Sequence, residues 1–310
     1  WAGAAYVYSG LDGSLLFEKT GEVSLDITGV AVAGAGDVNG DGRADFMLSG
    51  AGGLLGSVGS VFVYSGADGS LLHRKNNPLG VEIGFGNSWG NPLAGGGDVN
   101  GDGKDDFVIG AHWASIGDSV EAGTVFVYSG ANGTLLYRKD GTRRNAEMGW
   151  DVAFVGDVNG DGKDEIIIGA VDFPGQPPSQ GFRGKAYVIS GPTGATIYEL
   201  NNPDLHHGQF GWSVAGAGDV DGDGISDVIV GAPSWGRDSL NTALNIGLVS
   251  VYSGASGALL GQIEGPGPNK EFGNSVTSAG DLDGDGRAEI LVGAWRADPG
   301  GVQDAGSVFV

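Results

Sequence analysis

A nine-residue acidic segment occurs five times along this 310-residue chain, and it constrains the fold more than any other feature of the sequence. The first copy, residues 37–45, reads Asp-Val-Asn-Gly-Asp-Gly-Arg-Ala-Asp, and the copies begin at positions 37, 98, 157, 219 and 281. Successive copies therefore start 61, 59, 62 and 62 residues apart. A period of about sixty residues fits a four-stranded sheet with its turns, so the sequence predicts a repeat protein built from such units.

Each copy places oxygen-bearing side chains at positions 1, 3, 5 and 9, with glycines at positions 4 and 6. Calcium prefers roughly six to eight oxygen ligands in a flexible arrangement, and a tight loop can supply them. The seventh position adds a backbone carbonyl whatever its side chain is, which brings in Arg43, Lys104, Lys163, Ile225 and Arg287. Clustered carboxylates repel one another, and a cation relieves that repulsion. The segment is therefore interpreted as a calcium loop, with an acidic turn that binds no metal as the alternative.

EF-hands and dockerin-type loops also begin with Asp-x-Asn-x-Asp-Gly, but there position 12 is a Glu that opens a helix. In this chain position 12 is always apolar, being Leu48, Ile109, Ile168, Val230 and Val292. These residues lie in short β-branched runs, which favour a buried strand. The loop is therefore predicted to join one strand to the next.

The chain carries a formal net charge of −22, from 38 acidic and 16 basic residues. About five calcium ions, one per loop, would supply roughly ten positive charges and leave about −12, so part of the acidity is metal-ligand charge. The remaining negative field disfavours nucleic acid and anionic membranes as partners, because both select basic patches.

The sequence contains no cysteine, which excludes disulfides and thiolate metal sites. Weak calcium loops fill at the millimolar calcium of extracellular fluid and not at cytosolic levels, so we expect the chain outside the cell or on its surface. The chain starts at Trp1 with neither Met nor an apolar leader, so we expect a signal peptide to be absent or removed. No apolar run reaches about 18 residues, and we expect no membrane insertion.

Within each period the same four segments follow one another. A short first strand leads into the acidic loop, and an aliphatic second strand ends in Gly-Ala. After a variable loop comes a third strand such as residues 61–64, and a turn at residues 67–70 leads to a fourth strand at 71–75. The turn contains Asp-Gly between two apolar runs, which is a strong hairpin signal. Each unit is therefore predicted to be a four-stranded antiparallel meander, and radial stacking of such sheets gives an all-β propeller.

The succession of Phe-Gly, Gly-Asp-Val-Asn-Gly-Asp-Gly, Gly-Ala-Pro and Val-Tyr-Ser-Gly resembles the FG-GAP repeat of the integrin α-subunit propeller and its bacterial relatives. The likeness covers essentially the whole chain, although Gly-Ala-Pro is complete only at residues 231–233 and the first unit has Ile27-Thr28-Gly29 in place of Phe-Gly. The resemblance implies calcium loops on one rim and recognition on the opposite rim. The side-chain ligands that it implies are Asp37, Asn39, Asp41 and Asp45; Asp98, Asn100, Asp102 and Asp106; Asp157, Asn159, Asp161 and Glu165; Asp219, Asp221, Asp223 and Asp227; and Asp281, Asp283, Asp285 and Glu289.

We expect a single propeller domain over residues 1–310, with repeat units at about 1–26, 27–83, 84–147, 148–208, 209–270 and 271–310. Residues 4–7 and 307–310 both match the third strand, so they would compete for one place in a closed five-bladed ring. We therefore interpret the chain as most of a larger propeller that is truncated at both ends and linked to further domains. Seven blades are expected from the family likeness, and a five-bladed ring is the alternative.

The loops between second and third strands vary most, and they are expected on the rim opposite the metal loops. Their distinctive side chains, taken as candidate ligand-binding residues, are Trp113, Trp235, Arg237, Trp295 and Arg296. Exposed aromatics beside arginine suit sugar stacking or a protein anchor, and the alternative is that these tryptophans fill space between blades. The aromatic residues that precede first strands are interpreted as wedges between blades: Phe85, Trp150, Phe210, Trp212 and Phe272.

The sequence favours a calcium-stabilised extracellular module for adhesion or for binding a glycan or protein ligand. It contains no Gly-x-Ser-x-Gly elbow, no His-Glu-x-x-His, no Walker loop and no cysteine nucleophile, so catalysis is not expected. Two alternatives stay open. One is a polysaccharide lyase or other carbohydrate-active enzyme built on a calcium-bearing propeller, and the other is an architectural spacer.

Overall fold

The computed structural model describes residues 2–21, 28–50, 59–79, 92–171, 184–202, 208–236 and 245–310. Within these residues the only helical element is a 3-10 turn, η2, at Pro299–Gly301. All other regular elements are β-strands, and within each sheet the strands are hydrogen-bonded in the order in which they follow one another in the sequence. Every pairing within the sheets is antiparallel, which confirms the all-β meander predicted from the sequence.

Four sheets contain four strands each, and we number them as blades one to four. Blade one has β3 (Thr28–Gly36), β4 (Asp45–Gly50), β5 (Ser60–Tyr64) and β6 (Leu71–Asn76). Blade two has β7 (Leu93–Gly97), β8 (Asp106–Ala111), β9 (Thr124–Tyr128) and β10 (Leu135–Asp140). Blade three has β11 (Met148–Gly156), β12 (Glu165–Ala170), β13 (Lys185–Ile189) and β14 (Thr196–Asn201). Blade four has β15 (Ser213–Gly218), β16 (Asp227–Ala232), β17 (Leu248–Tyr252) and β18 (Leu259–Glu264).

Two smaller sheets complete the described strands. Near the N-terminus, β1 (Ala4–Tyr8) pairs with β2 (Leu15–Thr20). Near the C-terminus, blade five is formed by β19 (Phe272–Gly280), β20 (Glu289–Ala294) and β21 (Ser307–Phe309). The strands β1 and β21, which match the same place in the repeat, lie in these two separate sheets. The number of blades in the closed propeller stays a prediction.

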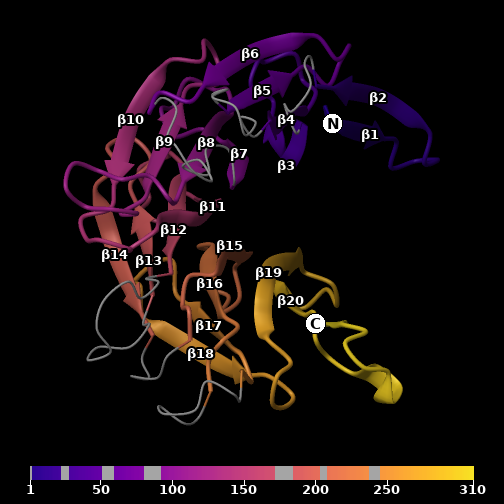
Figure 1. Cartoon of the computed structure of the whole chain (residues 1–310), viewed down its shortest axis with the longest axis vertical. Helices are drawn as coiled ribbons and strands as arrows, with labels where there is room; N and C mark the ends of the chain where they lie inside the picture. The colour runs from indigo at the N-terminus through magenta and orange to yellow at the C-terminus, as the bar shows by residue number, and fades with distance from the viewer. Residues whose placement is uncertain are drawn as a thin grey trace.

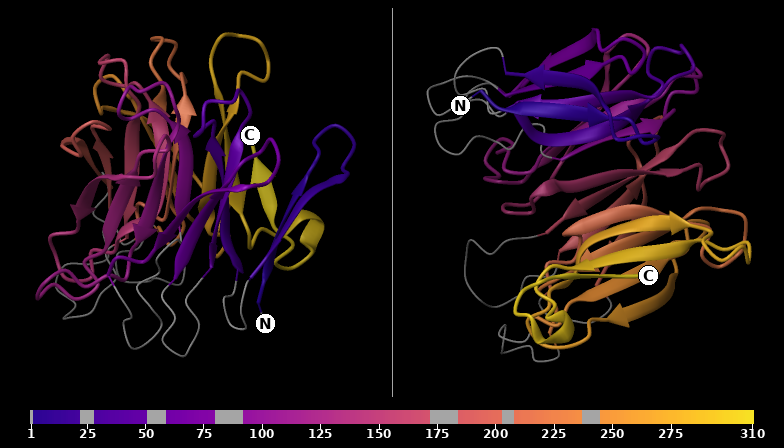
Figure 2. Two further views of the ribbon diagram at one scale, coloured as in Figure 1. Left: turned by 90° about the horizontal axis from the view of Figure 1, so that it is seen from above. Right: turned by 90° about the vertical axis from the view of Figure 1, so that its right-hand side faces the viewer.

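The sheets are arranged around a common centre as the blades of a β-propeller (Figure 1). The first strands β3, β7, β11, β15 and β19 lie innermost and contact one another in that order, whereas the fourth strands lie at the periphery (Figure 1). Seen from the side, the sheets stack face to face in chain order (Figure 2). No helix in the described ranges is long and apolar enough to cross a bilayer.

The second strands of blades two to four are buried along their whole length because a neighbouring blade covers each face of the sheet. Every residue of β8, β12 and β16 is buried, and these strands are nearly continuous aliphatic runs. The core lies between blades: Met47 of blade one packs in one cluster with Phe107 of blade two. Phe210 and Phe272 are 0% and 3% exposed, which confirms the wedge prediction for these two residues. Phe85 lies outside the described residues.

At the periphery, the fourth strands of blades one to three each reach the hairpin turn of the next blade. Lys139 Nζ in β10 donates to the carbonyl oxygen of Gly194 at 2.9 Å, and Tyr198 Oη in β14 donates to that of Ala255 at 2.7 Å. These bonds supplement the apolar contacts between blades. The hairpin turns lie on the same rim as the acidic loops, because both connections leave the sheet at the same end.

Candidate metal centres

Each acidic loop leaves its first strand at a β-bulge. The pairing register shifts between Gly34 and Gly36 in blade one, and an equivalent shift precedes the loop in every other blade. Gly36 has a φ of 68°, in the left-handed region that favours glycine. The bulge turns the chain away from the ladder, so the following residues form a loop and the second strand starts at position 9.

The first-position aspartate closes each loop around its own carboxylate. Asp37 Oδ1 accepts hydrogen bonds from the backbone amides of Gly40 and Asp41 at 2.7 and 3.0 Å, and Oδ2 accepts one from Gly42 at 2.7 Å. Gly40 and Gly42 have φ values of 78° and 84°, which explains why both are glycine. The same three bonds recur at Asp98, Asp157, Asp219 and Asp281.

The fifth-position carboxylate accepts a backbone hydrogen bond from position 7 in all five loops. The donors are Arg43, Lys104, Lys163, Ile225 and Arg287. This bond has the same form whether position 7 is basic or apolar, in keeping with a role for the backbone at this position. That the position-7 carbonyls bind metal stays a prediction.

The ninth-position carboxylate is the anchor of the loop. It is 2% exposed at Asp45 and 0% exposed at Asp106, Glu165 and Asp227. Asp106 Oδ2 accepts from the amide of Val99 at 3.0 Å, and Oδ1 accepts from the amide of Gly130 at 2.9 Å. Gly130 begins the hairpin turn of the same blade, so one buried side chain ties this turn to the acidic loop.

Burial raises the pKa of two of these anchors to about 7, namely Asp106 and Glu165. Neighbouring carboxylates add to the shift, since the ionised Asp102 disfavours a charge on Asp106 and the ionised Asp161 disfavours one on Glu165. Burial also raises the pKa of Asp45 and Asp227. A buried anion among other anions is the environment that a cation stabilises.

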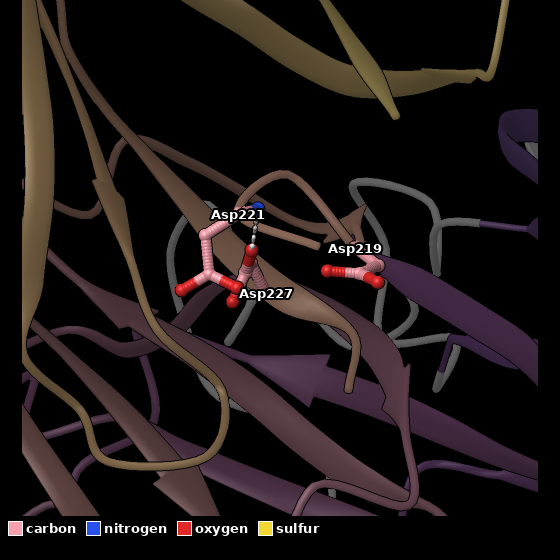
Figure 3. A group of neighbouring side chains, drawn as sticks. All are labelled: Asp219, Asp221 and Asp227. Carbon is pink, nitrogen blue, oxygen red and sulfur yellow. Dashed lines mark hydrogen bonds between the residues drawn. The ribbon is translucent and has the colours of Figure 1, made fainter. Parts of the chain in front are cut away.

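The loop of blade four brings three carboxylates together. Asp219, Asp221 and Asp227 each offer an oxygen, and these oxygens lie within 4.8 Å of one another (Figure 3). The backbone amide of Asp221 donates to Asp227 Oδ2 at 3.3 Å (Figure 3). This bond holds Asp221, at position 3 of the loop, beside Asp227, at position 9. Asp281, Asp283 and Asp285 form a second such group in blade five. An all-oxygen, mostly anionic donor set suits a hard divalent cation such as calcium.

In blades one to three the third position is asparagine. Asn159 Nδ2 donates to Glu165 Oε1 at 2.7 Å, and Asn100 Nδ2 donates to Asp106 Oδ2 at 3.1 Å. These amides therefore satisfy the anchor carboxylate with a proton donor. Asn159 Oδ1 accepts a hydrogen bond from the amide of Asp161 at 2.9 Å. An amide oxygen has a second lone pair and is a ligand that calcium takes, so the same residues fit a metal-bound loop.

The model of the FG-GAP repeat matches residues 89–128, 148–189, 210–252 and 272–310, which together make up more than half of the chain. The chain belongs to the FG-GAP repeat family. Each of the four matched segments contains an acidic loop, so the acidic loop recurs with the family repeat in this chain.

Integrin α chains are similar to this FG-GAP protein. Integrin alpha-V of Gallus gallus is 32% identical over 218 residues, covering 65% of this chain and 20% of the integrin. Integrin alpha pat-2 of Caenorhabditis elegans is 32% identical over 223 residues, covering 65% of this chain and 17% of the integrin. The chain thus spans about a fifth of the length of these relatives. The solved structure of the Dos1 propeller aligns with 80% of this chain and 49% of that one, with 15% identity and a TM-score of 0.44.

The glycines that give the FG-GAP repeat its name face one another across blade boundaries. A Cβ on Gly231, of the Gly-Ala-Pro motif in blade four, would lie 2.1 Å from the carbonyl oxygen of Gly273, of the Phe-Gly motif in blade five. A Cβ on Gly169 would lie 2.0 Å from the carbonyl oxygen of Gly211 in the same relationship. The backbones of the two glycines are in contact at each of these places, so no side chain fits between them. The Phe-Gly motif of one blade therefore packs directly on the Gly-Ala motif of the preceding blade.

The structure describes four of the five candidate ligand-binding residues, and these four differ in exposure. Trp113 and Trp295 are 37% and 53% exposed, whereas Trp235 is 3% exposed and belongs to the core between blades three and four. Trp235 is therefore a packing residue in this structure, as the space-filling alternative holds, and it presents no surface to a ligand. Arg237 lies outside the described residues.

Trp295 and Arg296 are held by a residue that the sequence analysis did not single out. Trp295 Nε1 donates to Glu271 Oε2 at 2.7 Å, and Arg296 Nη1 donates to Glu271 Oε1 at 3.0 Å. The guanidinium also lies 4.8 Å from the centre of the Trp295 ring. Glu271 has a φ of 51° and directly precedes Phe-Gly, a place that Glu147 and Gln209 occupy with the same conformation. That shared place is the sequence signal that could have identified it.

The tryptophans at the starts of β11 and β15 also differ from the simple wedges expected. Trp150 and Trp212 are half-buried, and their ring centres lie 4.6 Å apart across the boundary between blades three and four. His112 continues the series at 4.6 Å from Trp150, and Trp113 lies 5.1 Å from His112. Aromatic rings of blades two to four thus form one row, in which Trp113 is the exposed end.

Proposed function

We propose that this FG-GAP chain is a calcium-stabilised module that acts outside the cell or on its surface in adhesion or ligand binding. The observation that carries the proposal is the loop geometry repeated in five blades, with a buried anionic anchor described in four of them and a cluster of carboxylate oxygens in blades four and five. The likeness to integrin α chains supports an adhesive role.

The side chains at positions 1, 3, 5 and 9 would hold the metal, with the backbone at position 7. Bound calcium would supply the positive charge that offsets these carboxylates. The first-position aspartate would orient the loop through its three amide bonds, and the buried ninth position would transmit that order to the hairpin turn of the blade. Metal binding would therefore stabilise the blade as well as the loop.

The extracellular placement rests on affinity. Loops of this kind fill at the millimolar calcium found outside cells, and a fold that depends on several of them suits that environment. The length that the chain shares with its integrin relatives supports a module of a larger protein.

The proposed ligand surface lies on the rim opposite the calcium loops. Trp113, Trp295 and Arg296 stand in loops between second and third strands, which leave the sheets at the end away from the metal loops. Trp295 is held by Glu271 and remains 53% exposed, so its ring is positioned in advance for a ligand. An aromatic ring that is both exposed and fixed suits stacking on a sugar or insertion into a protein partner.

Calorimetric titration of chelator-stripped protein with calcium tests the metal part of the proposal. We expect about five ions to bind, and the melting temperature to rise steeply between chelator and millimolar calcium. A titration without heat, together with an unchanged melt, would contradict the proposal. Magnesium at the same concentration is the control, because its stricter octahedral geometry suits these flexible loops poorly.

Arrays of glycans and extracellular matrix proteins test the ligand part. Retention that is lost when Trp113 and Trp295 are both replaced by alanine would support recognition on the opposite rim. If no glycan or matrix protein on the arrays retains the chain, the result would favour the alternative of an architectural spacer. An unsaturated product released from acidic polysaccharides would favour the lyase alternative.

A further inference from the structure

Neighbouring metal loops are joined by residues at position 8, which are not among the predicted ligands. Asp105 Oδ2, in the loop of blade two, accepts a hydrogen bond of 2.6 Å from the backbone amide of Asp37, the first predicted ligand of blade one. The backbone amide of Asp105 donates in return to the carbonyl oxygen of Asp37 at 3.2 Å. Both polar groups of the Asp37 backbone are thus bound by one residue of the next blade.

The same pair of bonds occurs one blade further on. The backbone amide of Asp98 donates to Asp164 Oδ2 at 2.8 Å, and the amide of Asp164 donates to the carbonyl oxygen of Asp98 at 3.1 Å. Again the residue that is held is the first predicted ligand of the preceding loop.

The position-7 side chains reinforce this link. Lys104 extends over the loop of blade one, where its Cε would lie 3.1 Å from a Cβ on Gly40. Lys163 extends in the same way over Gly101 in the loop of blade two, at 3.0 Å. Each lysine therefore covers a glycine that hydrogen-bonds to the first ligand of that loop.

The link is weaker in the second half of the chain, where position 8 is Ser226 or Ala288. Ala288 keeps the backbone half of the pair, because its amide donates to the carbonyl oxygen of Asp219 at 2.8 Å. Within the described residues, neither the amide nor the hydroxyl of Ser226 bonds to Asp157, and the hydroxyl reaches only the carbonyl oxygen of Asp227 at 3.5 Å. Blades three and four are therefore joined at their loops without this pair of bonds.

We propose that Asp105 and Asp164 are positioning residues that couple calcium binding between successive blades. Each fixes the first ligand of the preceding loop, so ordering of one loop lowers the conformational entropy that its neighbour loses on binding metal. The carboxylate also adds negative charge beside that ligand. The loops that begin at residues 37, 98 and 157 then respond to calcium as a coupled series, and those that begin at 219 and 281 respond apart from it. This inference rests on the proposed calcium function.

Hydrogen–deuterium exchange of the full chain, followed loop by loop against free calcium, tests the coupling. In Asp105→Ala we expect the calcium midpoint for protection of residues 37–45 to rise roughly threefold to tenfold, because one charged hydrogen bond and one negative charge are lost. The midpoint for residues 219–227 should not change. Asp105→Asn keeps an acceptor oxygen without the charge, so a smaller rise is expected. Ser226→Ala is the matched control at position 8, and it should leave the midpoint for residues 157–165 unchanged.

A second variant distinguishes coupled calcium binding from the alternative that Asp105 only stabilises the contact between the two blades. Asp102→Ala removes a predicted ligand of the second loop while keeping Asp105, and coupling predicts a higher midpoint in the first loop as well. If Asp105→Ala lowers protection of residues 37–45 equally with and without calcium, with the midpoint unmoved, the coupling is wrong while the calcium function stands. If no loop of the wild-type chain gains protection from calcium, the proposed function fails and the coupling with it.

Discussion

Asp151 Oδ2 in blade three accepts a 2.8 Å hydrogen bond from the backbone amide of Val214 in blade four. Its other oxygen accepts from the amide of Val152 at 3.0 Å. At the equivalent place one blade further on, Ser213 Oγ accepts from the amide of Val276 at 3.1 Å. The inner strands of blades three and four, and of blades four and five, are thus each joined by a side-chain acceptor, and of these two acceptors Asp151 is the ionisable one.

Asp151→Asn should remove a pH dependence of stability. Burial raises the pKa of Asp151 to about 6, above its ordinary value of 3.8, so the folded chain binds this proton more tightly than the unfolded chain. The resulting stabilisation is complete below about pH 4 and is lost as the pH rises through 6. Asparagine keeps only one of the two acceptor oxygens, which should cost about 1 kcal/mol at every pH. Relative to the wild type, the free energy of unfolding of the variant should therefore rise by on the order of 1 to 3 kcal/mol between pH 4 and pH 8.

Urea unfolding of both proteins at pH 5 and pH 8, in saturating calcium, measures the difference. Ser213→Ala is the matched control, because it removes an acceptor without a charge and should cost about 1 kcal/mol at both pH values. A difference between Asp151→Asn and the wild type that is the same at pH 5 and pH 8 would show that the carboxylate does not titrate in this range.

Alanine at the fifth position of a loop should act mainly through calcium. Asp161→Ala removes a predicted ligand of blade three, and at calcium about a hundred times the dissociation constant the stabilisation lost is roughly 2.7 kcal/mol. In chelator only the bond to the Lys163 amide is lost, which is worth about 1 kcal/mol. Thermal melts in calcium and in chelator compare the two conditions, and equal losses would remove the metal assignment. The same result is expected for Asp41, Asp102, Asp223 and Asp285.

Gly231→Ala should destabilise the contact between blades four and five. The added Cβ would stand 2.1 Å from the carbonyl oxygen of Gly273, so backbone must move, at a cost of at least about 2 kcal/mol. Gly261→Ala is the matched control, because nothing lies within 4 Å of its Cβ position, and a change below about 0.5 kcal/mol is expected. The denaturant midpoints of the two variants measure this difference. Similar midpoints would show that the close approach of the blades at Gly231 does not contribute to the free energy of unfolding.

Substitution of the tryptophans in the variable loops should have different effects, because Trp235 lies in the core and Trp295 is exposed. Trp235→Ala empties a core position and should cost about 3 to 5 kcal/mol. Trp295→Ala loses one hydrogen bond to Glu271 and little buried area, so about 1 kcal/mol is expected. The free energy of unfolding and the retention of ligand are measured on the same samples. A stable Trp295→Ala protein that keeps full binding would move the proposed ligand surface elsewhere.

The shape of the acidic loop could be predicted from the sequence because most of the bonds that define it are local, whereas its binding of metal stays a prediction. The carboxylate of Asp37, the two glycines and the anchor Asp45 fall within nine residues, and the bonds among them need no other part of the chain. The meander was equally accessible, since each turn joins strands that pair with each other.

The exposure of the tryptophans could not be predicted, because a small offset in a variable loop decides it. Trp235 is the third residue after Ala232, and its amide closes a turn onto the carbonyl oxygen of Ala232 at 3.1 Å. Ala114 and Ala297 occupy the same place in their turns and are 0% and 4% exposed. The third residue after the alanine that ends the second strand thus faces the core in all three loops. Because the loops differ in length, the sequence alone does not show which of their residues are equivalent.

The cross-blade role of position 8 was also hidden. Asp105 and Asp37 are separated by 68 residues, and no local pattern marks an aspartate whose partner is the backbone of another repeat. Similarly, the row of Trp150, Trp212 and His112 forms only when three blades are placed side by side.

The bonds at the periphery bear on how the fold assembles during synthesis. Lys75 with Gly133, Lys139 with Gly194, and Tyr198 with Ala255 are 58, 55 and 57 residues apart, so each joins a segment to the one made immediately after it. A growing chain would therefore present a finished docking edge to every new blade as that blade leaves the ribosome. Each blade then serves as the template for its successor, and a repeat could be gained or lost in evolution without redesign of blades that do not touch it.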